Sequence, residues 1–363
     1  MSREDEELLQ AKPDALSDSV SALRLLNVSR LSITTLLLAL LYAGQFILLP
    51  SLDFDQFAEE LQFGGSTDRF SILALGVIPW ITAAAIIESI GIIVPPLQRM
   101  LGFSGRHCDP FSVSVLLLTL LIASTQAFGI NAALMAGGLV SSDGSMTTLL
   151  TVGTLVCGVV LHVAVARLID MFGTGFGFWL CIGWAFPISL AGGFWQLLDG
   201  ISVTSLSGTT IVLGNVAAFL FVTVVIAFLT RATLANNSNS LSPLLFPLMT
   251  ASVMTGFVLS FLAFAIPAFG DAMMQPRVIS TSFTIVIVGL IALLHYRAMR
   301  AFSPKRLWAA ASVLTALCLI VPELIAAASP YSFVFWFGIT SPMATMFFLA
   351  SMVAITTACH GRL

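Results

Sequence analysis

Apolar segments of membrane-spanning length alternate with short polar or Gly/Pro-rich segments along the whole chain. A transmembrane helix needs roughly 20 predominantly apolar residues. The segments that meet this requirement are 31–49, 70–93, 111–130, 147–168, 175–196, 209–230, 243–266, 280–298, 306–327 and 333–357. Most are apolar on nearly all sides, as expected for helices in lipid or in a bundle core. The pattern therefore predicts an all-α polytopic membrane protein with ten transmembrane helices.

The basic residues divide unequally between the two sides of this predicted topology. With the N-terminus inside, 13 of the 15 lie in inner segments: Arg3, Lys12, Arg24, Arg30, Arg99, Arg106, Arg167, Arg231, Arg297, Arg300, Lys305, Arg306 and Arg362. Only Arg69 and Arg277 lie in outer segments. Inner loops of membrane proteins are enriched in Lys and Arg. We therefore expect both termini in the cytoplasm.

Composition excludes several other classes of protein. Of the 363 residues, 58% are apolar and 9% are charged, whereas a soluble domain carries about 25% charged residues. The net charge of −3 and the lack of a basic stripe argue against nucleic-acid binding. The five cysteines and four histidines show no metal-ligand spacing, and no nucleophile–base pair stands out. We expect no enzyme activity, no metal and no cofactor.

Few charged residues fall within the predicted spans, where a charge is costly. Glu88 lies near the inner end of the second span, where we expect it to reach the interface by snorkelling. Glu323 lies near the outer end of the ninth span and is expected to be a boundary residue. Arg167 and Asp170, at the end of the fourth span, have the spacing of an interfacial ion pair.

Two prolines interrupt spans at corresponding places. Pro79 lies within the second span and Pro247 within the seventh, which is the second of the last five. Broken helices at matching positions indicate inverted repeats around a central pathway, although ordinary proline kinks would give the same pattern. The predicted organisation is then a cytoplasmic segment 1–30, a first half 31–196, a second half 209–357 and a short cytoplasmic C-terminus 358–363.

The run from Arg69 to Ala83, RFSILALGVIPWITA, closely resembles the second transmembrane segment of the SecY family of protein translocase channels. Weaker resemblances follow in the family's order. They are Ile93-Val94-Pro95-Pro96-Leu97, Gln126-Ala127-Phe128-Gly129-Ile130, Gly173-Thr174-Gly175, Leu319-Ile320-Val321-Pro322-Glu323 and Phe337-Gly338-Ile339-Thr340-Ser341, and the pair Gly64-Gly65 just before the run fits as well. Together they cover most of the chain.

The resemblance implies an hourglass channel between two inverted five-helix halves, closed by an apolar ring at its waist and opening sideways between the second and seventh helices. The implied ring positions are Val77, Ile81, Leu180, Trp184, Met249 and Ala344. The implied polar positions of the lateral gate are Thr82 and Gln126. A plug-like segment, 51–69, would carry Phe57 and Leu61. Bundle packing is the alternative role for each ring side chain.

The resemblance also implies partner subunits and a cellular location. The expected function is a protein-conducting channel in the bacterial inner membrane, passing unfolded polypeptide with SecE-like and possibly SecG-like subunits. The family's long cytosolic loops, which dock SecA or the ribosome, are short here, at 231–241 and 295–306. That puts such docking in doubt. A secondary transporter of a small solute and a non-conducting membrane scaffold are the alternative functions.

Overall fold

The computed structural model describes residues 28–53, 70–104, 107–140, 145–183, 242–265, 285–291, 293–294, 297, 315, 319, 350–351 and 355. Within these residues, three helices are long and apolar enough to cross a membrane: Val113–Ala136, Ser145–Phe172 and Leu245–Leu262. Two shorter apolar helices run over Val28–Gly44 and Ile78–Ile93. The predicted helical character is thus confirmed for this part of the chain, and three of its helices have the length and apolar composition needed to cross a membrane.

The second predicted span is shorter than expected. Helix α3 covers Ile78–Ile93, and the residues from 72 to 77 form turns. Gly76 has φ +56°, a left-handed conformation that glycine adopts without steric cost. Pro79 lies in the first helical turn, where its missing N–H leaves no helical hydrogen bond unmade. The expectation that Pro79 would interrupt a helix from within is therefore wrong, because the helix begins beside it.

A short hairpin follows α3 and leads into the next long helix. The 3₁₀ helix η2, Pro95–Leu97, ends the α-helical course, and strands β1, Phe103–Ser104, and β2, His107–Cys108, pair antiparallel. Helix α4, Val113–Ala136, then extends past its expected end at 130. Its cap residue Ser112 accepts a hydrogen bond from the backbone N–H of Val115.

Helices α5, Ser145–Phe172, and α6, Gly177–Gly183, are joined by a tight turn. Gly175 in this turn has φ +81°. A Cβ atom at Gly177 would collide with the backbone carbonyl of Ala166, so α5 and α6 approach each other more closely than a larger residue would permit. The glycines of this segment therefore set the path of the chain into α6.

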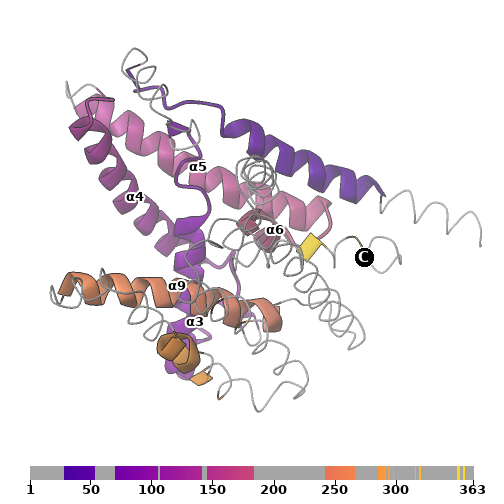
Figure 1. Ribbon diagram of the computed structural model, residues 1–363. Coiled ribbons are helices and arrows are strands. Elements are labelled where there is room, and N and C mark those ends of the chain that lie inside the picture. Colours follow the sequence, from indigo (N-terminus) through magenta and orange to yellow (C-terminus); the bar gives the residue numbers. More distant parts are fainter. Residues whose placement is uncertain are drawn as a thin grey trace, which may run out of the picture.

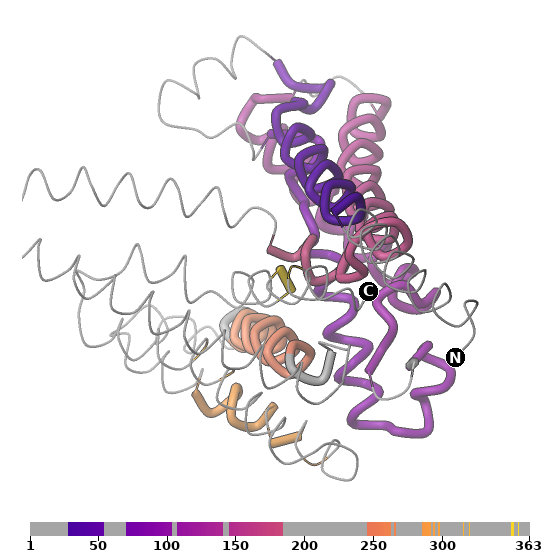
Figure 2. Tube along the Cα trace, turned by 90° about the vertical axis from the view of Figure 1, so that its right-hand side faces the viewer, coloured from indigo at the N-terminus to yellow at the C-terminus, as the bar shows by residue number. Residues whose placement is uncertain are grey.

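Helix α9, Ser242–Ala265, contains Pro247 as the sequence predicts. Figure 1 shows α4 and α5 side by side, and α3, which contacts both α4 and α9, crosses the orange α9 in this view. The side view in Figure 2 places the orange α9 away from the magenta α5. Helix α3 contacts α4, α5, α9 and strand β2, and it therefore links the α4–α5 pair to α9.

Two buried apolar clusters support this arrangement. The larger one joins α3, α6, α9 and the hairpin, and the smaller one joins α4, α5 and the segments that flank residues 54–69. Those flanking segments are fixed by backbone bridges between Leu48 and Ser71 and between Leu52 and Val140. Between helices in lipid, such clusters are stabilised mainly by van der Waals packing, since burial there removes little apolar surface from water.

Candidate functional site

The described ring positions lie in one buried cluster where α3, α6 and α9 meet. Val77, Ile81, Leu180 and Met249 are 6%, 3%, 2% and 0% exposed, respectively, and all belong to the larger apolar cluster. Val77 precedes α3 and Ile81 lies one turn into it, so the two share a helix face.

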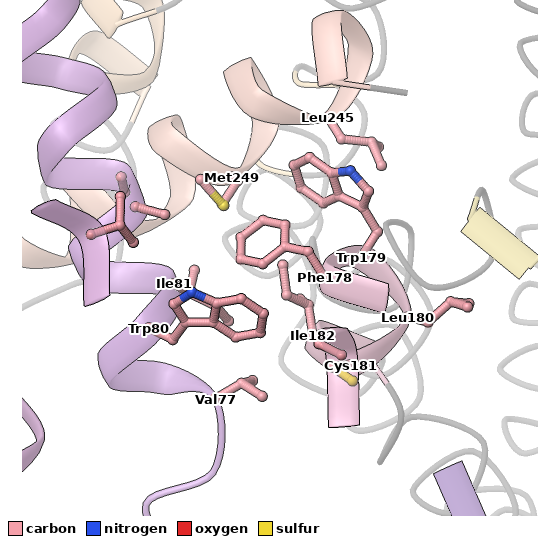
Figure 3. Close-up of a cluster of buried hydrophobic side chains, with 14 of the residues drawn as sticks. Val77, Trp80, Ile81, Phe178, Trp179, Leu180, Cys181, Ile182, Leu245 and Met249 are labelled. Atoms are coloured by element: carbon pink, nitrogen blue, oxygen red, sulfur yellow. The ribbon is translucent and has the colours of Figure 1, made fainter. Parts of the chain in front are cut away.

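Figure 3 shows how these side chains are oriented. The side chains of Ile81 and Met249 lie on the side of α6 from which Phe178 projects, and that of Leu180 lies on the opposite side. The structure thus gathers Ile81 and Met249 around one contact region, with Val77 below them in the view. Trp184 and Ala344 lie outside the described residues. The ring role of all six positions stays a prediction.

Four aromatic side chains form the centre of this region, and the sequence analysis did not identify them. Trp80 and Phe178 pack edge to face with ring centroids 4.7 Å apart. Trp179 packs edge to face on Phe246 at 5.1 Å, and Phe178 lies 6.4 Å from Phe246. We call Trp80, Phe178, Trp179 and Phe246 the aromatic cluster. Trp80 follows Pro79 and Phe246 precedes Pro247. Their positions beside the two prolines were the only feature of the sequence that could have pointed to these two aromatic residues.

The aromatic cluster is attached to the hairpin region by a hydrogen bond. The indole N–H of Trp80 donates to the carbonyl oxygen of Pro110 at 2.9 Å, and its ring packs on Phe111 at 5.3 Å. The guanidinium of Arg167 lies over the Phe111 ring at 5.0 Å. These contacts connect α3, the segment that precedes α4 and the last turns of α5.

Glu88 does not snorkel to the interface. Its side chain is fully buried, with Oε1 2.7 Å from Nδ1 of His107. Its other oxygen, Oε2, accepts a hydrogen bond from the backbone N–H of Cys108 at 2.8 Å. The snorkelling prediction is wrong because the hairpin folds over the end of α3 and supplies polar partners inside the protein. No sequence spacing would have paired residues 88 and 107.

Cys108 lies beside this pair and is itself buried. Its thiol donates to the carbonyl oxygen of Ala84 at 3.5 Å. Burial, followed by the nearby Glu88 carboxylate, raises the pKa of the Cys108 thiol. The side chain therefore stays a neutral thiol, which is a poor nucleophile and a poor metal ligand.

Arg167 and Asp170 do not form the predicted ion pair in the described part of the chain. Arg167 lies over Phe111, and Oδ1 of Asp170 accepts a hydrogen bond from the backbone N–H of Gly177 at 2.7 Å. Asp170 therefore fixes the turn between α5 and α6. The prediction is wrong because each side chain finds a partner on another segment of the fold.

The predicted gate and plug residues are only partly described. Thr82 is half-buried on α3, and its hydroxyl donates to the carbonyl of Ile78 at 2.8 Å within the same helix. Gln126 is half-buried on α4. Phe57 and Leu61 lie outside the described residues. The gate and plug roles stay predictions.

The chemistry of these residues suits packing and closure. Among the described residues no group of three or more His, Cys, Asp or Glu side chains could hold a metal ion. The larger cluster consists of apolar side chains, and the buried pair Glu88 and His107 lies beside its member Cys108. Such a surface excludes water and makes no directional contact with a particular sequence.

Comparison with known sequences finds the same family that the motifs indicate. No family model matches the chain. Over 172 residues, the chain is 33% identical to protein translocase subunit SecY of Rickettsia typhi, covering 41% of this chain and 39% of that protein. Over 152 residues, it is 31% identical to SecY of Vibrio cholerae, covering 37% and 34% of the two chains.

Comparison with solved structures covers more of the chain. Sec61 in the canine ribosome–channel complex from the endoplasmic reticulum has a TM-score of 0.54 at 13% identity, over 92% of this chain and 91% of that chain. A structure described as a protein conducting channel has a TM-score of 0.50 over the same shares, also at 13% identity. The chain is SecY-like.

The extent of the likeness differs between sequence and fold. In sequence, the SecY-like chain spans about two fifths of the length of the curated relatives it matches, since 39% of the Rickettsia typhi protein is covered. In fold, the likeness to Sec61 reaches nearly the whole chain. Divergent sequence on a common fold is expected where apolar side chains are interchangeable in lipid.

Proposed function

We propose that this SecY-like chain is the channel-forming subunit of a bacterial inner-membrane protein translocase. The observation that carries the proposal is its 33% identity to protein translocase subunit SecY over 172 residues. The Sec61-like fold over 92% of the chain supports it. The chain would conduct unfolded polypeptide and catalyse no reaction.

The proposed waist is the apolar ring of Val77, Ile81, Leu180, Trp184, Met249 and Ala344. Four of these side chains are buried in one cluster, which supports a dry constriction. A dewetted apolar constriction blocks ions at rest. Because its contacts are non-directional, it also accepts many different polypeptide sequences. Opening would separate α3 from α9, with Thr82 and Gln126 as polar groups of the lateral gate.

The proposed architecture is ten spans in two inverted five-helix halves with both termini in the cytoplasm. The 13-to-2 division of basic residues supports this orientation. The three long apolar helices and the Sec61-like fold are consistent with it. The proposed partners within the membrane are a SecE-like and possibly a SecG-like subunit.

We expect weak docking of SecA or ribosomes. Specific protein interfaces bury about 1,200–2,000 Å² in total, and the loops 231–241 and 295–306 are short. A side-by-side binding titration in nanodiscs at fixed salt, with a SecE-like partner present, would compare this chain with an ordinary SecY complex. Equal affinity would contradict the expectation.

The channel function is tested by crosslinking a stalled polypeptide. A photoreactive residue at Ile81 or Met249 should crosslink a translocating chain in reconstituted membranes, because both positions would line the pathway. The matched control is Phe261 on α9, which is 60% exposed on the outside of the described fold. Crosslinks at Phe261 alone, or none at Ile81 and Met249, would contradict the channel proposal and favour a membrane scaffold.

A further inference from the structure

Phe246 connects the hairpin to the aromatic cluster. Its ring, 1% exposed, lies parallel to the ring of His107, with centroids 4.8 Å apart and an interplanar angle of 4°. On another side it contacts Trp179 of α6 at 5.1 Å. The first turns of α9 are therefore packed between strand β2 and α6.

The orientation of the His107 ring depends on Glu88. Nδ1 of His107 lies 2.7 Å from Oε1 of Glu88, whereas Nε2 is buried without a hydrogen-bond partner in the described part of the chain. Glu88 is fixed in turn by the backbone N–H of Cys108. Removing the carboxylate would leave no polar contact to orient the imidazole.

The stacked residue immediately precedes the proline within α9. Pro247 has no amide hydrogen, so it cannot bond to the carbonyl of Pro243 four residues earlier, and its ring crowds that carbonyl. The turn before Pro247 is therefore attached to the rest of α9 by a weakened hydrogen-bond ladder. Its position depends on packing, and His107 supplies one face of that packing.

Packing alone does not explain the buried pair Glu88 and His107, because apolar side chains would fill the same space without the cost of burying polar groups. Desolvation of a buried charge is unfavourable, and apolar residues of similar volume often stabilise a fold equally well. What the pair supplies is a fixed ring plane, because a hydrogen bond is directional and an apolar contact is not. The geometry at Phe246, with a 4° interplanar angle, uses that property.

We propose that Glu88 and His107 are positioning residues that hold the first turns of α9, through Phe246, against α3 and α6. The pair thereby keeps α3 and α9 in contact with each other at the end of α9 that lies against the hairpin. The idea rests on the proposed channel function for its consequence, since this contact limits ion leakage only in a channel. The positioning itself is a property of the fold.

The test combines local amide exchange with conductance. In nanodiscs, hydrogen exchange by residues 245–250 is measured for the full chain and for two variants, Glu88→Gln/His107→Phe and Phe246→Leu. The first replaces the pair without leaving a lone buried charge, and the second removes the stacked ring. Both should raise exchange in 245–250 by at least about fivefold while exchange in α5 stays unchanged. Resting ion conductance in planar bilayers should rise with it.

The matched control is Cys108→Ala. Cys108 is buried beside the pair, and its backbone N–H still caps Glu88 after the change. It should leave exchange in 245–250 at the wild-type level. The proposal is overturned if the pair variant and Phe246→Leu leave that exchange unchanged, or if they raise exchange in α5 equally.

The two proposals can fail separately. Absence of polypeptide crosslinks at Ile81 and Met249 in the unaltered protein would refute the channel. The exchange of residues 245–250 does not depend on conduction and would still decide the positioning role. Should the pair variant fail to fold, Glu88→Met, which removes the carboxylate that contacts Nδ1 of His107 and leaves Phe246 in place, gives the decisive exchange measurement.

Discussion

The backbone N–H of Leu49 donates to the carbonyl oxygen of Phe70 at 2.9 Å, and this bond joins the two ends of the predicted plug-like region. A second bond, from the N–H of Ile72 to the carbonyl of Ile47 at 2.9 Å, lies beside it. The described segments on the two sides of residues 54–69 are therefore joined directly to each other. Changes within residues 54–69 should then leave the surrounding fold intact, because its bridges lie outside them.

A first prediction concerns the plug-like segment. Phe57→Ser with Leu61→Ser should raise resting ion conductance severalfold, because a seal against the waist needs apolar side chains. The thermal midpoint in detergent should change little. The control is Gln56→Ser with Gln62→Ser, which alters polar neighbours of similar position. Equal conductance in both double variants would show that these apolar residues do not seal the channel.

A second prediction concerns the ring. Ile81→Asn and Met249→Asn should each increase resting conductance, because a polar side chain wets an apolar constriction. Each should also lower stability by about 1–3 kcal/mol through burial of an unpaired amide. Ile78→Asn, at a position on α3 that is 52% exposed, is the control and should leave conductance unchanged. Unaltered conductance in well-folded Ile81 and Met249 variants would assign both residues to ordinary core packing.

A third prediction compares two glycines of α5. A Cβ at Gly158 would collide with the backbone carbonyl of Ile72, whereas a Cβ at Gly153 meets nothing within 4 Å. Gly158→Ala should cost about 1–3 kcal/mol or abolish folding, because backbone rather than a flexible side chain must shift. Gly153→Ala should be neutral or stabilising. Folded yield and thermal midpoint in detergent measure both, and equal behaviour would contradict the close approach of α5 to residue 72.

A fourth prediction follows from the raised pKa of Cys108. Burial and the Glu88 carboxylate favour the neutral thiol, so less thiolate exists at pH 8 than in an ordinary cysteine. In a variant that retains only this cysteine, alkylation at pH 8 should be at least about tenfold slower in the folded than in the unfolded protein. Because the folded pKa is raised, stability should fall as the pH rises above the ordinary thiol value. Rapid alkylation of the folded protein would show that the hairpin does not cover Cys108.

A fifth prediction concerns topology. Reporter fusions after Gly138 and Gly200 should report the outer side, and a fusion after Asn237 the cytoplasm, as the division of basic residues requires. The physical reason is that Lys and Arg flanking a span resist transfer across the membrane. Reversed reports at two of these three sites would reject the ten-span topology.

The sequence alone determined the features that depend on local composition. Apolar runs located the long helices, since crossing a bilayer requires about 20 such residues whatever the fold. The RFSILALGVIPWITA run indicated the SecY likeness, and Pro247 lies inside a helix as its position predicted. Chemical character and segment length suffice for such inferences.

The tertiary structure decided which residues meet. Pro79 lies in the first turn of α3 because a turn at Gly76, with φ +56°, precedes the helix. The length of the apolar segment could not reveal that turn. Glu88 is buried and not at the interface because the hairpin places His107 2.7 Å away. The stacking of Phe246 on His107 joins residues far apart in the chain. Apolar periodicity in a membrane helix has little amphipathic signal, since lipid and core are equally apolar, so the sequence could not show which face packs and against what.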